Sequence, residues 1–349
     1  MSVPPEASSA PDAAPARPGD TGPDLPAPGE ELFGAPAASG AQFRLARGGA
    51  EAVVVGLAGA LRTYRVGGVD VTEPYGPDTV PPAGNGIQMS PWPNRVAGGR
   101  WSLDGAEQVL DVTEPARGNA IHGLLRNTHL VPEEVSGHAV TLRGEIHPQH
   151  GWPFRLTHRV TYALAEDGAL TVTMALQNHA DAVAPVAFGA HPFLRIGDVP
   201  TEELTLHVAA DSWIRTDERL IPVGLEPTAG SEHDFRAGRR VGSAALDVGL
   251  TDLTPEEDGR HRARLVAPDG RSVALWSDPA FACTHVFVTD RLPGRPVALA
   301  VEPLTAPADA LNSGTGLHRL APGETLTARW GLTADLSTPT HTDRQESRA

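Results

Sequence analysis

Two residues of this chain combine the side chains and the setting that proton transfer needs. His191 closes the apolar run 186–190, Glu302 closes the apolar run 297–301, and each is followed directly by proline. Proline cannot donate a hydrogen bond to a sheet ladder, so we expect a strand to stop at each of these residues. An imidazole and a carboxylate that face each other across a cleft could move protons to and from a neutral substrate.

The apolar run before Glu302 predicts a desolvated carboxylate. Desolvation raises the pKa of a carboxyl group and makes it a better base near neutral pH. The alternative role for Glu302 is a buried structural ion pair with an arginine such as Arg95. Both roles place the carboxylate inside the protein.

Two further segments carry polar groups at constrained positions. Arg95 follows Trp92-Pro93-Asn94, and its planar guanidinium suits paired hydroxyl or carbonyl oxygens. A surface ion pair is the alternative role for this arginine. His122 precedes Gly123, which allows close backbone approach. A histidine beside apolar residues is otherwise typical of a satisfied structural group.

Composition excludes several classes of function. The net charge of the 349 residues is -15, which argues against a nucleic-acid partner and against attraction to an anionic membrane. A neutral or cationic small molecule fits this charge better than a polyanion. The single cysteine, Cys283, allows no intramolecular disulfide, and we expect a buried residue in a cytoplasmic protein. No apolar run is long enough for a transmembrane helix.

Alternation of apolar and polar residues predicts an all-β protein. Residues 155–164 and 170–177 alternate with a period of two on either side of Glu166-Asp167-Gly168, as expected for a hairpin. Frequent glycine and proline leave little room for long helices. Further strands are expected over 203–208, 272–277, 284–289, 297–302 and 325–332, with one short helical turn at 308–311.

We therefore expect one large antiparallel β-sandwich domain over residues 41–336. A disordered leader rich in proline and alanine is expected over residues 1–40, and a loose tail over 337–349. Sequence signatures of phosphate loops, dinucleotide folds, zinc sites and nucleophile elbows are missing from the sequence. The sequence thus predicts neither a cofactor nor a metal site.

Several segments, taken in order, resemble the aldose 1-epimerase (galactose mutarotase) family. The resemblance covers about residues 41–332. No single motif is specific, but the ordered set is. The matching segments are Pro93-Asn94-Arg95-Val96, Ile121-His122-Gly123, Gly151-Trp152-Pro153-Phe154, His191-Pro192-Phe193, Leu246-Asp247, Val301-Glu302-Pro303 and Asp309-Ala310-Leu311-Asn312-Ser313-Gly314.

The resemblance implies a fold and a set of roles. The fold would be a large antiparallel β-sandwich with an open sugar-binding cleft. His191 and Glu302 would be the catalytic residues, and the substrate-binding residues would be Arg95, His122, Asp247, Asn94 and Trp92. Asp247 matches less well because the segment 245–250 lacks the aromatic residue that often follows. Trp92 would stack on the apolar face of the sugar, with plain core packing as the alternative.

The implied activity is interconversion of the α and β anomers of a hexose such as glucose or galactose. Glu302 would take the proton of the C1 hydroxyl, and protonated His191 would give a proton to the ring oxygen O5. The partner would be a small aldose, and the protein a monomer or a homodimer. Two alternatives stay open. A hexose-6-phosphate 1-epimerase would need extra basic residues at the pocket mouth, for which Arg117 and Arg126 are candidates. A carbohydrate-binding protein would keep the cleft without turnover.

Overall fold

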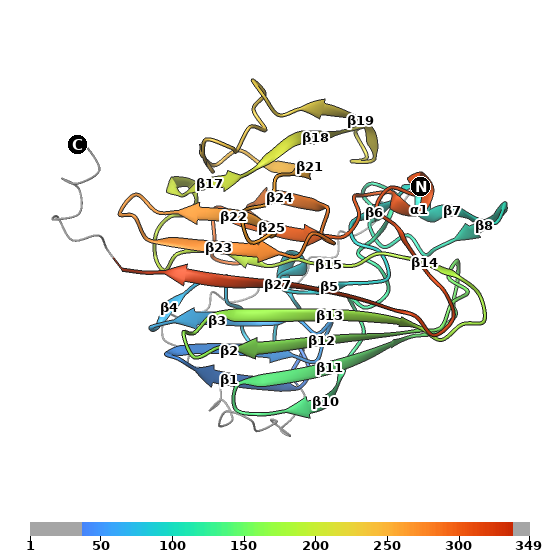
Figure 1. Cartoon of the computed structure of the whole chain (residues 1–349), viewed down its shortest axis with the longest axis horizontal. Coiled ribbons are helices and arrows are strands. Elements are labelled where there is room, and N and C mark those ends of the chain that lie inside the picture. The colour runs from blue at the N-terminus through green and yellow to red at the C-terminus, as the bar shows by residue number, and fades with distance from the viewer. Residues whose placement is uncertain (1–36, 338–349) are drawn as a thin grey trace, which may run out of the picture.

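The computed structural model describes residues 37–337 and is built almost entirely from antiparallel strands (Figure 1). The largest sheet has nine strands. In spatial order they are β10 (Val131–Val135), β11 (Ala139–Ile146), β12 (Leu156–Leu164), β13 (Leu170–Asn178), β27 (Thr325–Asp335), β23 (Ser272–Ser277), β22 (His261–Val266), β17 (Thr205–Val208) and β20 (Arg239–Arg240).

A second sheet of eight strands carries Asp247, His285 and Glu302, which are discussed below. Its order is β19 (Pro222–Pro227), β18 (Ala210–Thr216), β21 (Leu246–Leu253), β24 (Cys283–Thr289), β25 (Ala298–Leu304), β15 (Gly189–Ala190) and β5 (Gln88–Met89), with β16 (Phe193–Leu194) also paired to β25.

Smaller elements complete the described part of the chain. A four-stranded sheet contains β1 (Gln42–Arg47), β2 (Ala50–Val55), β3 (Leu61–Val66) and β4 (Val69–Asp70). Three two-stranded ladders join β6 (Arg95–Val96) to β9 (Ala120–Ile121), β7 (Arg100–Leu103) to β8 (Ala106–Val109), and β14 (Ala184–Val186) to β26 (His318–Leu320). The helical elements are α1 (Ala310–Ser313) and the 3-10 turns η1 (Pro82–Gly84), η2 (Ala97–Gly99) and η3 (Thr201–Glu203).

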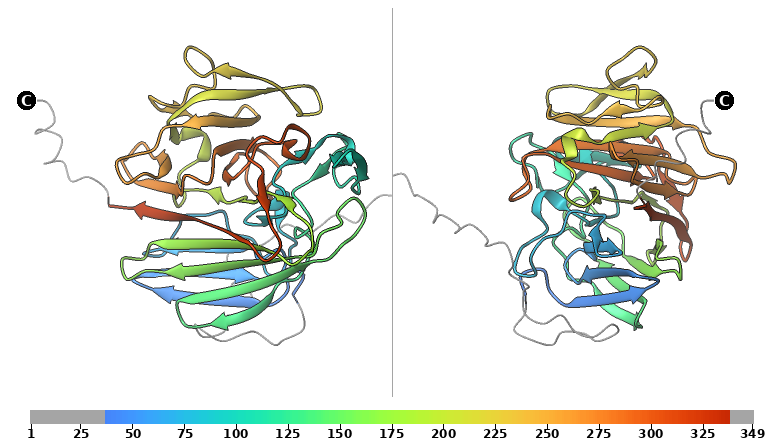
Figure 2. Two further views of the ribbon diagram at one scale, coloured as in Figure 1. Left: turned by 45° about the vertical axis from the view of Figure 1, so that its right-hand side comes forward. Right: turned by 90° about the vertical axis from the view of Figure 1, so that its left-hand side faces the viewer.

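The sheets share one apolar core. Strands β11 to β13 bury every second side chain, and the four-stranded sheet packs against them, as the two views of Figure 2 show. Leu45 of the four-stranded sheet, Val172 of the nine-stranded sheet and Val286 of the eight-stranded sheet belong to the same buried cluster. Tyr162 of β12 fastens two layers, because its hydroxyl donates to the Gly59 carbonyl and accepts from the Gln88 amide. The antiparallel sheets, packed against each other through this core, form a β-sandwich.

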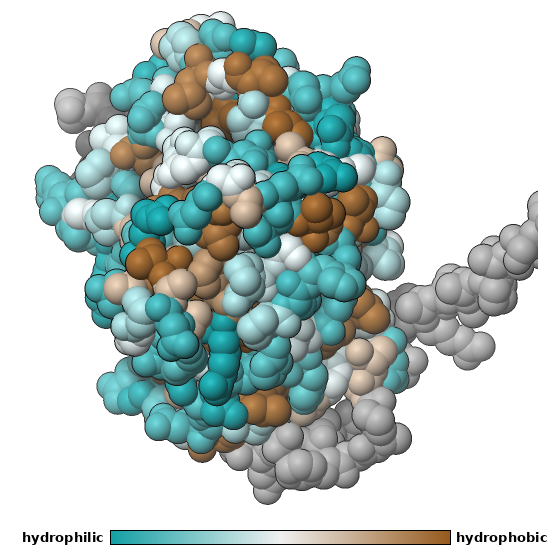
Figure 3. All heavy atoms as spheres, turned by 90° about the vertical axis from the view of Figure 1, so that its right-hand side faces the viewer, coloured by the Kyte–Doolittle hydropathy of each residue, from teal (hydrophilic) through white to brown (hydrophobic). Residues whose placement is uncertain are grey.

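The outer surface is mixed in character. On the face shown in Figure 3, hydrophilic and hydrophobic residues are interspersed. Large apolar side chains that reach solvent include Val223 and Leu225 of β19. Between residues 37 and 337, no helix has the length and apolar character needed to cross a membrane.

The predicted strands are confirmed apart from two boundaries. The hairpin of β12 and β13, the strands β23, β24 and β27, and a short helix at α1 lie within a few residues of their expected positions. Strand β25 does not stop at Glu302: it continues through Pro303 to Leu304, because proline can stay extended and removes only one donor. The expected strand at 203–208 begins at Thr205, because Pro200 starts the 3-10 turn η3 before it.

The expected leader, 1–40, and the expected tail, 337–349, fall largely outside the described residues. Residues 37–40 are described and form a turn. The backbone N–H of Gly40 donates to the Ala37 carbonyl, and both the backbone N–H and the hydroxyl of Ser39 donate to the Pro77 carbonyl. These four residues therefore belong with the folded domain rather than with the leader.

Candidate active site

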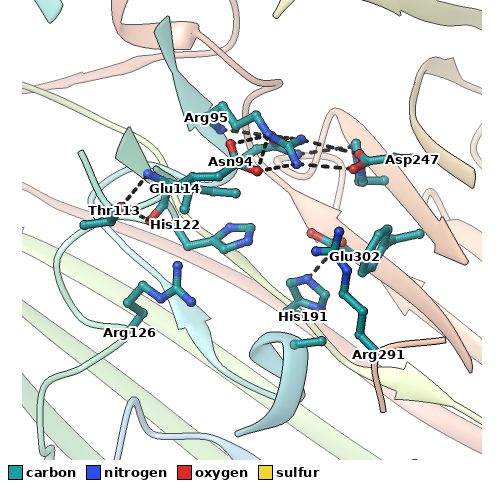
Figure 4. Close-up of a pocket in the computed structure, with 14 residues that line it drawn as sticks. Asn94, Arg95, Thr113, Glu114, His122, Arg126, His191, Asp247, Arg291 and Glu302 are labelled. Atoms are coloured by element: carbon teal, nitrogen blue, oxygen red, sulfur yellow. Dashed lines mark hydrogen bonds and ion pairs between the residues drawn. The ribbon is translucent and has the colours of Figure 1, made fainter. Parts of the chain in front are cut away.

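Sheet register brings His191 and Glu302 together. The strands before and after His191, β15 and β16, both pair with β25, through Gly189 with Leu304 and Phe193 with Ala300. Continuing the same register across the gap places His191 opposite Glu302. Their side chains meet there, with Nε2 of His191 3.3 Å from Oε1 of Glu302 (Figure 4). The ladder is interrupted only where these two side chains face the pocket.

Burial separates the proton affinities of this pair. The side chains of His191 and Glu302 are 4% and 2% exposed. Burial lowers the pKa of His191 to about 3 and raises the pKa of Glu302 to about 7. At neutral pH the free pocket therefore holds a neutral His191 beside the Glu302 carboxyl group, whose pKa is close to the pH. The sequence-based expectation of a protonated His191 does not describe this free state.

A second histidine lies on the other side of Glu302. His285 of β24 is the register partner of Glu302 in β25. Its Nε2–H donates to a carboxylate oxygen of Asp247 at 2.7 Å. Burial lowers the pKa of His285, but the hydrogen bond to Asp247 and the charge of Glu302 outweigh it and raise the pKa overall. Asp247 is in turn held ionised, because bonds and charges from His285 and Arg95 outweigh its burial and lower its pKa.

Arg95 joins this network from the opposite wall of the pocket. Its guanidinium donates to Glu114, with Nε 3.0 Å from Oε2, and to Asp247, with Nη2 3.2 Å from Oδ2. Its side chain is only 7% exposed, so the pairs are buried rather than on the surface. The alternative pairing of Arg95 with Glu302 is not present, and the Glu302 carboxylate remains directed at His191. Arg95 is thus held in place by two carboxylates.

Backbone strain positions the residues next to Arg95. Asn94 and His122 both adopt positive φ, at 53° and 64°, and the N–H of His122 donates to the Asn94 carbonyl at 2.9 Å. The ladder between β6 and β9 holds these two ends together. A Cβ on Gly123 would lie 2.2 Å from the Ser90 carbonyl oxygen, so the close approach expected of this glycine is present. Left-handed non-glycine residues are costly and cluster at functional sites.

The imidazole of His122 stands edge-on to that of His191, with ring centroids 5.3 Å apart. Burial, and after it the charges of His191, Arg126 and Arg95, hold the pKa of His122 well below its usual range. His122 is therefore a neutral hydrogen-bonding group at physiological pH.

Trp92 does not line the pocket. It belongs to the buried core, 2% exposed, and its ring lies 5.7 Å from that of Trp152. The expectation that Trp92 stacks on a substrate is wrong, and the core-packing alternative describes it. The aromatic residue that does line the pocket is Phe287 of β24, which is half-buried and stands edge-on to His191.

Asn94, Arg95, Glu114, His122, His191, Asp247, His285, Phe287 and Glu302 border one open pocket of about 690 Å³, a volume that includes the part continuous with solvent. Figure 4 shows how the walls are divided, with Arg95 and Asn94 facing Asp247, and His122 beside His191. The described residues that line it are Ala83, Asn94, Arg95, Thr113, Glu114, Ile121, His122, Arg126, His191, Asp247, His285, Phe287, Arg291 and Glu302. A polyol can be bound here by hydrogen bonds on every side, next to a pair that can exchange a proton.

Comparison with known proteins decides the family. The family described as aldose 1-epimerase matches residues 42–333, which is most of the chain. The chain belongs to the aldose 1-epimerase family.

Curated relatives match the chain over different lengths. A protein of Escherichia coli K12 described as uncharacterized protein YihR is 29% identical over 286 residues, covering 82% of this chain and 91% of that protein. Rat galactose mutarotase is 32% identical over 159 residues, which covers 43% of this chain and 44% of the rat protein. The longer match is thus to a relative without an assigned activity.

Solved structures of aldose 1-epimerase homologues share the fold. A putative aldose 1-epimerase from Escherichia coli K12 superposes with a TM-score of 0.73 at 20% identity, covering 84% of this chain and 98% of that one. A homologue from Caenorhabditis elegans superposes with a TM-score of 0.74 at 17% identity, over 84% of this chain and 98% of its own. The predicted galactose mutarotase-like sandwich is confirmed.

Part of the pocket could not be predicted from the sequence. His285 and Phe287 lie on the predicted strand 284–289, two residues apart and hence on one face. The alternation predicts that these two side chains share a face, but only the pairing of β24 with β25 shows that this face lines the pocket. Glu114 and Arg291 come from irregular segments and carried no signal of their own. Arg126 was expected only as a candidate basic residue at the pocket mouth, and it does line the pocket.

Proposed function

We propose that this chain interconverts the α and β anomers of a hexose by opening and closing the sugar ring. The observation that carries the proposal is the buried contact of His191 with Glu302, whose pKa values are driven apart. Family membership supports an isomerase of this kind. The exchange of one proton between two positioned groups is what this reaction needs.

The reaction begins with one proton on the pair, and burial places it on Glu302. When the C1 hydroxyl donates a hydrogen bond to Glu302, the carboxylate form is stabilised, and this favours transfer of the resting proton across the 3.3 Å contact to His191. Glu302 then takes the proton of O1 while His191 gives its proton to O5. The O1–H electrons form the C1 carbonyl, and the electrons of the broken C1–O5 bond stay on O5.

Rotation about C1–C2 turns the other face of the aldehyde toward O5, and closure runs the two transfers backwards. Arg95, His122, Asp247 and Asn94 would hold the remaining hydroxyls, so that the open chain stays aligned. Phe287 offers an apolar face for the C–H side of the ring. A sugar held in this way needs no group from outside the described pocket for the proton steps.

Anomer exchange is the direct test. Fresh α-D-glucose and α-D-galactose are followed by polarimetry or by the NMR signals of the anomeric protons. Replacing Glu302 by glutamine keeps its shape and removes the base, so the catalysed rate should fall by about 10²–10⁴-fold. Glu257, an exposed glutamate, gives the matched control Glu257→Gln, which should behave as wild type. Wild-type catalysis in Glu302→Gln would overturn the assignment, and tight sugar binding without exchange would favour a carbohydrate-binding protein.

A further inference from the structure

The pocket differs in charge from the molecule around it. The whole chain carries a net charge of -15, yet three arginines, Arg95, Arg126 and Arg291, line this one pocket. Arg95 is neutralised by its bonds to Glu114 and Asp247. The other two arginines are not compensated in the same way. Two arginines without a bonded acid in one pocket of an acidic protein are a local feature that needs a cause.

Arg126 is the more constrained of the two. It sits on the turn that follows Gly123, and the turn is fixed by the bond from the Leu124 N–H to the Ser90 carbonyl, 2.8 Å, and by the Thr128 hydroxyl on the Leu124 carbonyl, 2.9 Å. The side chain is half-buried and points into the pocket beside His122 (Figure 4). Over residues 37–337 its guanidinium has neither a hydrogen bond nor an ion pair.

The nearby acid cannot serve as its partner. Glu114 is close enough to act on Arg126 electrostatically, but its oxygens already accept from Arg95, Arg117 and Asn119. Burial lowers the pKa of Arg126, which is the mark of a guanidinium that has lost water without gaining an anion. Arg291 stands at the exposed rim of the same pocket, and its guanidinium also has no bonded acid among the described residues.

We propose that the substrate is an aldose whose C6 carries an anionic group, and that Arg126 binds this group. The inference rests on the proposed function, because it uses the placement of the ring oxygen at His191. C6 is attached to C5, the carbon that bears O5, so a substituent at C6 lies on the His191 side of the sugar. Arg126 lies beside His122, whose ring centroid is 5.3 Å from that of His191, so its guanidinium is near that side of the sugar. A planar guanidinium pairs well with phosphate, sulfonate or carboxylate oxygens.

The first experiment compares sugars on the full-length wild-type protein. Anomer exchange is measured for glucose, glucose 6-phosphate, 6-deoxy-6-sulfoglucose and glucuronate, each corrected for its own uncatalysed rate. We expect kcat/KM for at least one anionic sugar to exceed that for glucose by about tenfold or more, as for a charge-assisted hydrogen bond. Comparison of the three anionic sugars identifies which anionic group the pocket binds. The preference should shrink as salt concentration rises.

The second experiment assigns the preference to a residue. Arg126→Gln should lower the ratio of anionic to neutral kcat/KM by about 10- to 100-fold, chiefly through KM, and Arg126→Lys should restore part of it. Arg319→Gln removes the same charge from an exposed position in β26, away from the pocket, and should leave the ratio unchanged.

The outcomes separate the two proposals. Exchange of glucose as fast as every anionic sugar, or an unchanged ratio in Arg126→Gln, overturns the anionic substrate and leaves the epimerase function standing. Acceleration of no sugar at all overturns the epimerase function and this inference with it.

Discussion

His285 lies directly opposite Glu302 in the antiparallel ladder of β24 and β25. Glu302 is therefore flanked by two histidines, one from each neighbouring strand, and their pKa values move in opposite directions. His285 has the carboxylate of Asp247 as a partner, whereas the ring of His191 stacks on Phe193, with centroids 5.2 Å apart. The difference in surroundings explains why one histidine is prepared to hold a charge and the other is not.

The protonation of the pair predicts the pH dependence of activity. The active form carries one proton shared by His191 and Glu302, whichever of them holds it. This form persists between the pKa of His191, about 3, and that of Glu302, about 7, and is lost as pH rises above 7. We therefore expect kcat/KM for glucose to be level from pH 5 to 6 and to fall about tenfold per unit well above pH 7.

A rate that increases through pH 7 would mean that the unprotonated pair is the active form. The proton for O5 would then have to come from another group. The profile of Glu257→Gln serves as the control for general effects of pH on the protein.

His285 should tune Glu302 rather than touch the reacting atoms. Its charge lowers the pKa of Glu302, so replacing it by glutamine should raise that pKa further. The limb of the pH profile above 7 should move to higher pH in His285→Gln, because the shared proton is then retained longer. The measurement is kcat/KM from pH 6 to 9. A reduced rate with an unmoved limb would show that His285 only supports the local structure.

The close approach of Gly123 to Ser90 should be essential to the pocket. Alanine at this position would place Cβ 2.2 Å from the Ser90 carbonyl oxygen, in addition to the strain of a φ of 71°. We expect Gly123→Ala to lower the free energy of unfolding by more than the ~1–3 kcal/mol of backbone strain alone. Gly67→Ala is the matched control, since its φ is 56° and nothing lies within 4 Å of the added Cβ. Equal melting temperatures for the two variants would refute the steric argument.

Substitutions at two aromatic residues should affect stability and sugar binding separately. Trp92→Phe removes volume from the core and should cost about 1–3 kcal/mol of stability without changing KM for the sugar. Phe287→Ala should raise KM, because it removes the apolar face that lines the pocket. Denaturant unfolding and anomer-exchange kinetics on both variants check this. A raised KM in Trp92→Phe alone would restore the stacking role to the tryptophan.

The sequence predicted the fold well because strand alternation is a local property. The hairpin of β12 and β13 is visible in the spacing of its own residues, and the buried setting of Glu302 follows from the run before it. The network around Arg95 was not predictable in this way. Its partners Glu114 and Asp247 lie 19 and 152 residues away in sequence, and only folding brings them together.

Two of the wrong expectations have a common physical origin. Proline was expected to end β25, and a tryptophan near the site was expected to face a ligand. In both cases tertiary contacts decided: β24 and β15 hold β25 extended past Pro303, and Trp152 buries Trp92. The local sequence allows a residue more than one environment, and its tertiary contacts determine which one it occupies.

The register that sets His191 against Glu302 has a consequence for how this protein can vary. Side chains alternate faces along a strand, so an insertion or deletion of one residue within β25, between Ala298 and Glu302, would turn the carboxylate away from both histidines. A loop such as the one around Gly294, where the space beside the chain is open, can change length without moving the pair. Insertions and deletions should therefore be tolerated in the loops around the pocket, and they should abolish activity when they fall within the strands that carry the pair.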